Sequence, residues 1–89
     1  MKIWKWPIRI ACQQIVMMPV GSKILTVQMQ GLQPQVWALV CETQDAPEVP
    51  RVITIYGTGS PILRPPGEYV ATFQTNGGDL VWHAFDETV

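Results

Sequence analysis

Residues 23–30, KILTVQMQ, alternate in polarity, with Leu25, Val27 and Met29 on one side and hydroxyl or amide side chains on the other. A period of two residues predicts a β-strand that buries one of its faces. Residues 36–41, VWALVC, are apolar throughout, and this predicts a central strand that is covered on both faces. No window of the chain repeats apolar residues with the spacing of a capped amphipathic helix. These two segments therefore predict an all-β fold.

The same alternation continues on both sides of these segments. Val, Ile and Thr make up 25 of the 89 residues, an enrichment that favours strands. Pro7 cannot donate to a strand ladder, so the first strand is expected at a sheet edge. Asn76-Gly77-Gly78 predicts a tight hairpin turn. The further strands are expected at residues 2–10, 12–18, 51–56, 68–75 and 79–86.

Chain length and strand count together define the expected architecture. A chain of 89 residues has the size of one domain, so we expect a single β domain over residues 1–89. About seven short, mostly antiparallel strands with closely spaced turns are typical of a sandwich or a partly open barrel. The connections expected between strands include a polar loop at residues 42–50 and a longer irregular loop at residues 57–67.

Charge is distributed unevenly along the chain. The formal net charge is −1, which lacks the basic excess of a typical nucleic-acid-binding protein. Residues 1–41 carry four cations and no acid, whereas residues 42–89 carry two cations and seven acids. Such asymmetry is compatible with an anion-binding face. It is equally compatible with two halves that fold together and mix their charges on the surface.

The cysteines and the N-terminus indicate the expected compartment. Cys12 and Cys41 lie in apolar runs, where cysteine behaves as a small hydrophobic residue. Two cysteines and one histidine have no recognisable zinc spacing, so neither a metal nor another cofactor is expected. Residues 1–7 lack the apolar stretch of a signal peptide, and no apolar run is long enough to span a membrane. These features predict reduced thiols in the cytoplasm.

The segment Tyr56-Gly57-Thr58-Gly59-Ser60 is the first candidate binding site. Its glycines permit close approach of a ligand to the backbone, and its hydroxyls add donors that suit a phosphate or a carboxylate. The segment has neither the Walker spacing nor a dinucleotide fingerprint. A plain turn that ends a strand explains the same composition.

Aromatic and basic residues near the N-terminus form the second candidate. Trp6, with Lys5 and Arg9, could stack on a base and bind its phosphate, and the first strand would have to lie near residues 56–60 to do so. Alternatively, tryptophan fills the core of a small domain, or the apolar edge at residues 2–10 pairs with another copy of the chain. His83 is the one histidine, and it is expected as a polar wall of the site or as a hydrogen-bonded structural residue.

Five segments spread along the chain carry a family resemblance. They are MPVGSKILTVQ (residues 18–28), WALV (37–40), IYGTG (55–59), residues 69–73 and VWHAF (81–85). In these segments the chain resembles a small family of uncharacterised proteins encoded by phages and prophages. The resemblance implies a phage accessory protein in the bacterial cytoplasm, and it implies no activity.

These observations predict a non-enzymatic binding protein. No pair of acid–base side chains suggests catalysis. By the resemblance, the expected target is a component of bacterial host defence, reached by sequestering a small nucleotide-like signal. The alternatives are a protein that docks on and inhibits a host protein, and a minor virion or assembly protein. A homo-oligomer, most simply a dimer, is expected, whereas binding to DNA or to a membrane is not.

Overall fold

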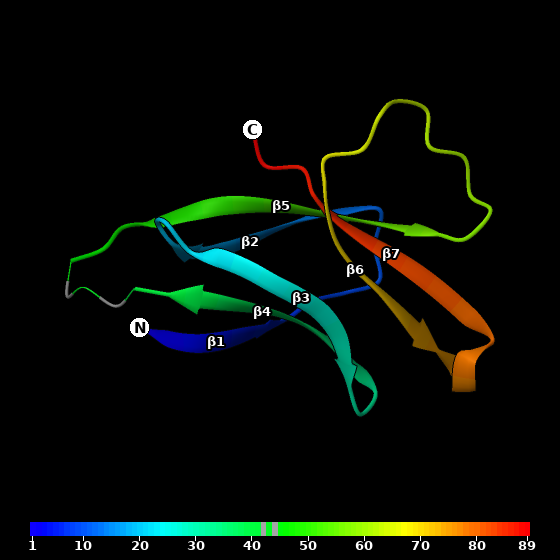
Figure 1. The fold of residues 1–89 in the computed structure, drawn as a ribbon, viewed down its shortest axis with the longest axis horizontal. Helices are drawn as coiled ribbons and strands as arrows, with labels where there is room; N and C mark the ends of the chain where they lie inside the picture. Colours follow the sequence, from blue (N-terminus) through cyan, green and yellow to red (C-terminus); the bar gives the residue numbers. More distant parts are fainter. Residues whose placement is uncertain (42, 44) are drawn as a thin grey trace.

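A computed structural model describes every residue of the chain except residues 42 and 44. The described residues form seven β-strands and a single 3-10 turn (Figure 1). The strands are β1 (Lys2–Pro7), β2 (Gln13–Pro19), β3 (Lys23–Gln30), β4 (Gln33–Val40), β5 (Glu48–Gly57), β6 (Glu68–Thr75) and β7 (Leu80–Asp86), and the turn is η1 (Asn76–Gly78). The all-β prediction is confirmed.

The strands form two antiparallel sheets that share one core. The three-stranded sheet has the order β1-β4-β3, and the four-stranded sheet has the order β2-β5-β7-β6. The expectation of a central strand at residues 36–41 is confirmed by β4, which pairs on both sides. Neither sheet closes into a barrel. The inner faces of both sheets supply the buried side chains of the core, which include Val16, Met18, Val27, Val36, Ala38, Ile53, Phe73 and Ala84.

Two sides of this sandwich differ. On one side β3 and β6 lie next to each other, which closes the core there (Figure 1). On the other side β1 and β2 each pair with a single neighbour among the described residues, β4 and β5 respectively. The prediction of an edge strand at the N-terminus is therefore confirmed for β1, and β2 is a second free edge.

Prolines account for the strand boundaries that the sequence analysis placed wrongly. The central strand was expected to begin at residue 36 and residue 50 to lie in a loop, but β4 begins at Gln33 and β5 begins at Glu48. Pro34 lies where the ladder between β1 and β4 ends, with its carbonyl accepting from the Ile8 N–H at 3.0 Å. The ring nitrogen of Pro50 points away from β2. On that side β5 pairs with β7, and this pairing begins only at Ile53, so no strand lies opposite Pro50 there among the described residues. Pro50 therefore removes no ladder hydrogen bond, and the Ile8 carbonyl opposite Pro34 accepts from the Gln33 side chain at 2.8 Å instead.

The first strand is shorter than the sequence predicted. β1 ends at Pro7 rather than at residue 10, because the chain then crosses from the three-stranded sheet to the four-stranded sheet. The Gln14 side chain fixes this crossing by accepting from the Arg9 N–H at 3.0 Å and donating to the Arg9 carbonyl at 2.6 Å. The cysteines were also placed wrongly, since Cys12 and Cys41 lie just outside the strands as exposed free thiols.

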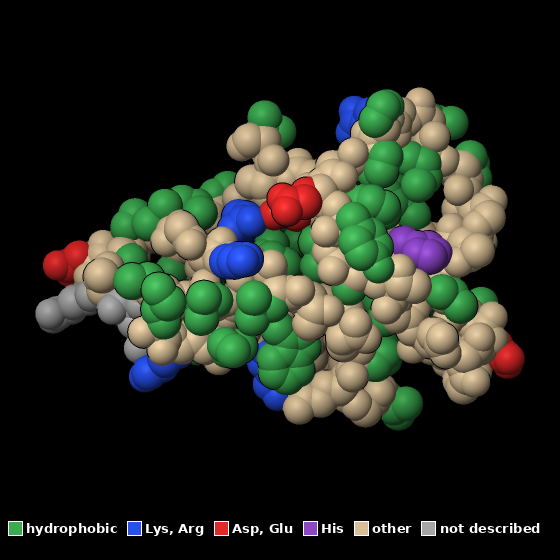
Figure 2. All heavy atoms as spheres, in the orientation of Figure 1, with side chains coloured by type: hydrophobic (Ala, Val, Ile, Leu, Met, Phe, Trp, Pro, Cys, Tyr) green, Lys and Arg blue, Asp and Glu red, His purple; other side chains and the backbone are tan. Residues whose placement is uncertain are grey.

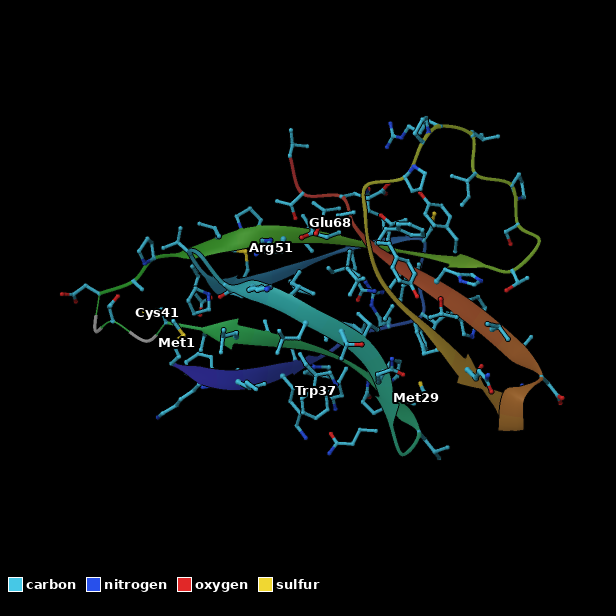
Figure 3. All side chains as sticks on the ribbon, viewed as in Figure 1. Met1, Met29, Trp37, Cys41, Arg51 and Glu68 are labelled. Atoms are coloured by element: carbon cyan, nitrogen blue, oxygen red, sulfur yellow. The ribbon has the colours of Figure 1, made fainter. Side chains whose placement is uncertain are left out.

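An ion pair joins β5, β7 and the turn between β2 and β3. The Arg51 guanidinium donates to the Asp86 carboxylate at 2.6 Å and to the Ser22 carbonyl at 2.7 Å. Burial alone would raise the pKa of Asp86, but hydrogen bonds from Thr88 and from Arg51 lower it below its ordinary value. Figure 3 labels Arg51 and Glu68, which line the same small hollow beside β3.

Among the described residues, no helix has the length and apolarity needed to cross a membrane.

Candidate functional site

A chain of hydrogen bonds surrounds His83 on the outer face of the four-stranded sheet. The register pairs His83 on β7 with Tyr56 on β5 and with Thr72 on β6, so these side chains share one face. The Thr58 hydroxyl lies 2.7 Å from Nε2 of His83, and the Thr72 hydroxyl lies 3.1 Å from Nδ1. The Tyr69 hydroxyl continues the chain at 2.8 Å from that of Thr72. Figure 2 shows the histidine, in purple, beside the loop that follows β5.

This arrangement holds the imidazole rather than activating it. Both ring nitrogens have a hydroxyl partner, and no carboxylate among the described residues hydrogen-bonds to either nitrogen. A general base needs an oriented imidazole with a nitrogen available to the substrate. The geometry therefore fits the structural interpretation of His83, a histidine that is satisfied by its neighbours.

The loop at residues 57–60 directs its donors inward. The Thr58 N–H and the Thr58 hydroxyl both donate to the Val81 carbonyl, each at 3.1 Å. The Ser60 N–H donates to the Gly57 carbonyl at 3.0 Å, which closes a tight turn. Gly59 has φ +87°, a conformation that only glycine adopts readily. The backbone N–H of Thr58 is thus occupied by Val81 on β7, and that of Ser60 by the turn itself.

A carboxylate lies beside Tyr56, the remaining residue of this segment. The Tyr56 hydroxyl is 3.3 Å from the Glu87 carboxylate, which also accepts from the Gly67 N–H at 3.1 Å. The pKa of Glu87 is below its ordinary value because of the Thr54 hydroxyl, and also because of the donors of Gly67 and Tyr56. The buried Thr54 hydroxyl has no hydrogen-bond partner of ordinary geometry among the described residues.

The effect of this carboxylate on Tyr56 opposes anion binding. Burial and the adjacent Glu87 charge raise the pKa of Tyr56 above its ordinary value. A negative charge that disfavours a tyrosinate also disfavours a bound phosphate at the same place. The electrostatic environment of Tyr56 is therefore unsuited to an anion.

The basic residue Lys5 lies far from this loop in the topology. It is on the outer face of the three-stranded sheet, where its ammonium lies 5.4 Å from the ring centroid of Trp37 and hydrogen-bonds to Gln30. Figure 3 labels Trp37 beside β1 and β4. Within one chain, Lys5 and the segment at residues 56–60 occupy outer faces of different sheets.

Trp6 and Arg9 instead border an open groove between the two free edges. This groove, which we call the β1–β2 groove, has a volume of about 740 Å³. Its floor combines inward side chains of both sheets, and its rim carries one cation and one acid. The residues that define it are Trp6, Ile8, Arg9, Gln14, Val16 and Glu48.

Exposed apolar side chains flank the β1–β2 groove. Trp4 is 38% exposed and packs edge-on against Trp6, with ring centroids 6.2 Å apart. Ile15 and Met17 on β2 are 66% and 45% exposed. The sequence analysis missed these two residues as surface features, because residues 15–18 are apolar on both faces and gave no sign of which face is buried.

Comparisons with known proteins place the chain in a family. No curated protein and no solved structure matches it. A family model described as a domain of unknown function matches residues 1–89, which is the full chain. The protein therefore belongs to the DUF7352 family.

Proposed function

We propose that this protein is a non-enzymatic binding protein that docks on another protein through the β1–β2 groove. The observation that carries the proposal is the exposed aromatic and apolar surface around this groove, formed by Trp4, Ile15 and Met17. Tryptophan and arginine, which border the groove as Trp6 and Arg9, are enriched in binding hot spots between proteins. The groove is an open surface hollow rather than an enclosed cavity, which suits a protein segment better than a small molecule.

The alternative of a sequestered nucleotide-like signal has weaker support. It requires free donors and cations at residues 57–60, where the backbone donors of Thr58 and Ser60 are occupied and a carboxylate lies beside Tyr56. Of the candidate cations, Lys5 lies on the other sheet and Arg9 borders the β1–β2 groove. Arg64 acts on Tyr56 and Glu87 from the loop between β5 and β6, but the pKa of Tyr56 stays raised by burial and by the adjacent Glu87 carboxylate.

The biological setting belongs to the proposal as well. The resemblance to phage-encoded proteins makes a bacterial host protein, such as a component of host defence, the expected partner. Membership of a family of unknown function is compatible with this setting.

Affinity capture with matched variants tests the proposed function. The native protein, an Arg9→Glu/Trp4→Ser variant and a Thr58→Ala control would each be used to recover proteins from a bacterial lysate, with quantitative mass spectrometry as the readout. We expect a host protein that native and Thr58→Ala retain and that the groove variant loses. In parallel, a panel of linear and cyclic nucleotides is tested for an increase in melting temperature. A nucleotide that stabilises the native protein but not Thr58→Ala, without any groove-dependent protein, would overturn the proposal.

A further inference from the structure

Strand β2 presents an unpaired backbone edge. Its ladder with β5 includes a bond from the Ile55 N–H to the Cys12 carbonyl and one from the Val20 N–H to the Pro47 carbonyl. Antiparallel ladders alternate, so the even-numbered residues of β2 bond to β5 and the odd-numbered residues point their N–H and C=O groups the other way. Among the described residues no strand pairs on that side. The outward donors belong to Gln13, Ile15 and Met17.

This edge lacks the usual protection against pairing. Natural sheet edges carry charges, prolines or covering loops that prevent another chain from adding a strand. Both β1 and β2 end in a proline, Pro7 and Pro19, but β1 also follows this rule with Lys2 and Lys5. β2, with the sequence QQIVMMP, has no charged residue, and Ile15 and Met17 remain exposed on it. The β2 edge is therefore the more open of the two free edges.

We infer that a second copy of this chain pairs with it through antiparallel contact of β2 with β2, which makes one continuous eight-stranded sheet. Only residues with outward backbone groups can bond across the contact, so odd-numbered residues face odd-numbered residues. The symmetric register places the two-fold axis at Ile15, which lies beside Ile15 of the partner copy. Gln13 then lies opposite Met17 of the partner copy. The dimer therefore buries both Ile15 side chains, which are exposed in the single chain.

Charge at the ends of β2 supports a second copy of the chain as the partner. Arg9 is tied to Gln14 at the beginning of the strand, and Glu48 pairs with Pro19 at its end. Both residues border the β1–β2 groove. An antiparallel copy brings the arginine end of each chain toward the glutamate end of the other, so opposite charges approach at both ends. The pattern is self-complementary, as a two-fold interface requires.

The same reasoning disfavours an interface at β1. The sequence analysis expected self-pairing through residues 2–10, but antiparallel pairing of β1 with its copy brings lysines of both chains onto one short ladder. Like charges facing each other across strands are destabilising. The dimer covers Ile15 and Met17, which also belong to the proposed docking surface, so a host protein that binds there competes with the second copy. The dimer goes beyond the proposed function, and its test measures mass rather than binding of a host protein, so either one can fail alone.

Light scattering during size-exclusion chromatography measures the mass directly. The native protein is expected to elute as a dimer at high micromolar concentration. Ile15→Lys, which sets two ammonium groups side by side at the axis, is expected to weaken the dimer roughly tenfold or more. Ile3→Lys, an equally exposed change on β1, is the matched control and should leave the mass unchanged. A native monomer, or a dimer that only Ile3→Lys dissociates, would overturn the inference.

A cross-link tests the register independently of stability. In a chain with both native cysteines replaced by serine, Ile15→Cys should form an intermolecular disulfide under mild oxidation, because facing residues of an antiparallel pair lie about 5.5 Å apart. Ile3→Cys in the same background should stay monomeric. Efficient cross-linking at Ile3 with none at Ile15 contradicts the β2 interface.

Discussion

Replacement of Arg51 with methionine removes the ion pair that joins β5, β7 and the turn before β3. Arg51 and Asp86 have side chains that are 18% and 11% exposed, and their closest atoms are 2.6 Å apart. Methionine keeps much of the apolar length of arginine but cannot donate. The change leaves the Asp86 carboxylate with hydrogen bonds from Thr88 alone and leaves the Ser22 carbonyl without its side-chain donor.

The expected loss follows from the incomplete burial of the pair. Breaking a fully buried pair costs about 3–5 kcal/mol, and one hydrogen bond to a charged group contributes about 1.5–3 kcal/mol. Because Asp86 keeps its Thr88 donors and some access to water, we expect the free energy of unfolding to fall by about 2–3 kcal/mol. With a urea dependence near 1 kcal/mol per molar, the unfolding midpoint should move down by about 2–3 M.

Urea unfolding at pH 7 and at pH 3 is the assay. The pKa of Asp86 is lowered in the folded protein, so its stabilisation is present above about pH 4 and is lost as the pH falls through the folded pKa. The difference between native and Arg51→Met should therefore shrink at pH 3. Arg64→Met, in the exposed loop, is the control and should change stability by less than about 0.5 kcal/mol. A loss below about 1 kcal/mol at pH 7, or an equal loss at both pH values, would refute the reasoning.

Three further predictions concern local features. Gly67→Ala should destabilise the fold by about 1–3 kcal/mol in thermal or urea unfolding, because the added Cβ would lie 2.3 Å from the Asp86 carbonyl oxygen; an unchanged midpoint would contradict this close approach. Absorbance titration should show Tyr56 ionising above its ordinary pKa, and stability should fall as the pH rises through that value; Glu87→Gln should lower the pKa, and an unchanged titration would argue against the contact. Replacing both exposed cysteines by serine should cost less than about 0.5 kcal/mol each, and a larger loss in melting temperature would indicate a packing role.

The strand pattern was predictable where polarity alternates. Residues 23–30 and 68–75 form strands with the predicted bounds. Within residues 23–30, Val27 and Met29 face the core as predicted, but a register shift between Ile24 and Thr26 leaves Leu25 exposed and packs Ile24 against the core instead.

The strand boundaries near Pro34 and Pro50 were missed. A proline destabilises a strand only where a neighbouring strand would accept a hydrogen bond from the N–H that proline lacks. That depends on strand order, which local sequence does not contain.

The candidate site shows the same limit. The sequence analysis expected Lys5 near residues 56–60, but β1 pairs with β4 and β5 belongs to the other sheet. The partners of His83 come from the end of β5 and from β6, and they meet only after three strands align. The position of Lys5 and the partners of His83 both depend on pairing between distant segments. The periodicity of the sequence indicates only which side chains of one strand are buried.

The order of strands also has a consequence for the folding pathway. Only β3 with β4 and β6 with β7 pair with strands adjacent in sequence, so these two hairpins can form by closing short loops. β1 and β2 must wait for β4 and β5, which lie much further along the chain, and such distant pairings slow folding. We expect the first nineteen residues to become ordered last. Their amide hydrogens should also exchange with solvent before those of the two hairpins, during brief openings that leave the rest of the sandwich intact.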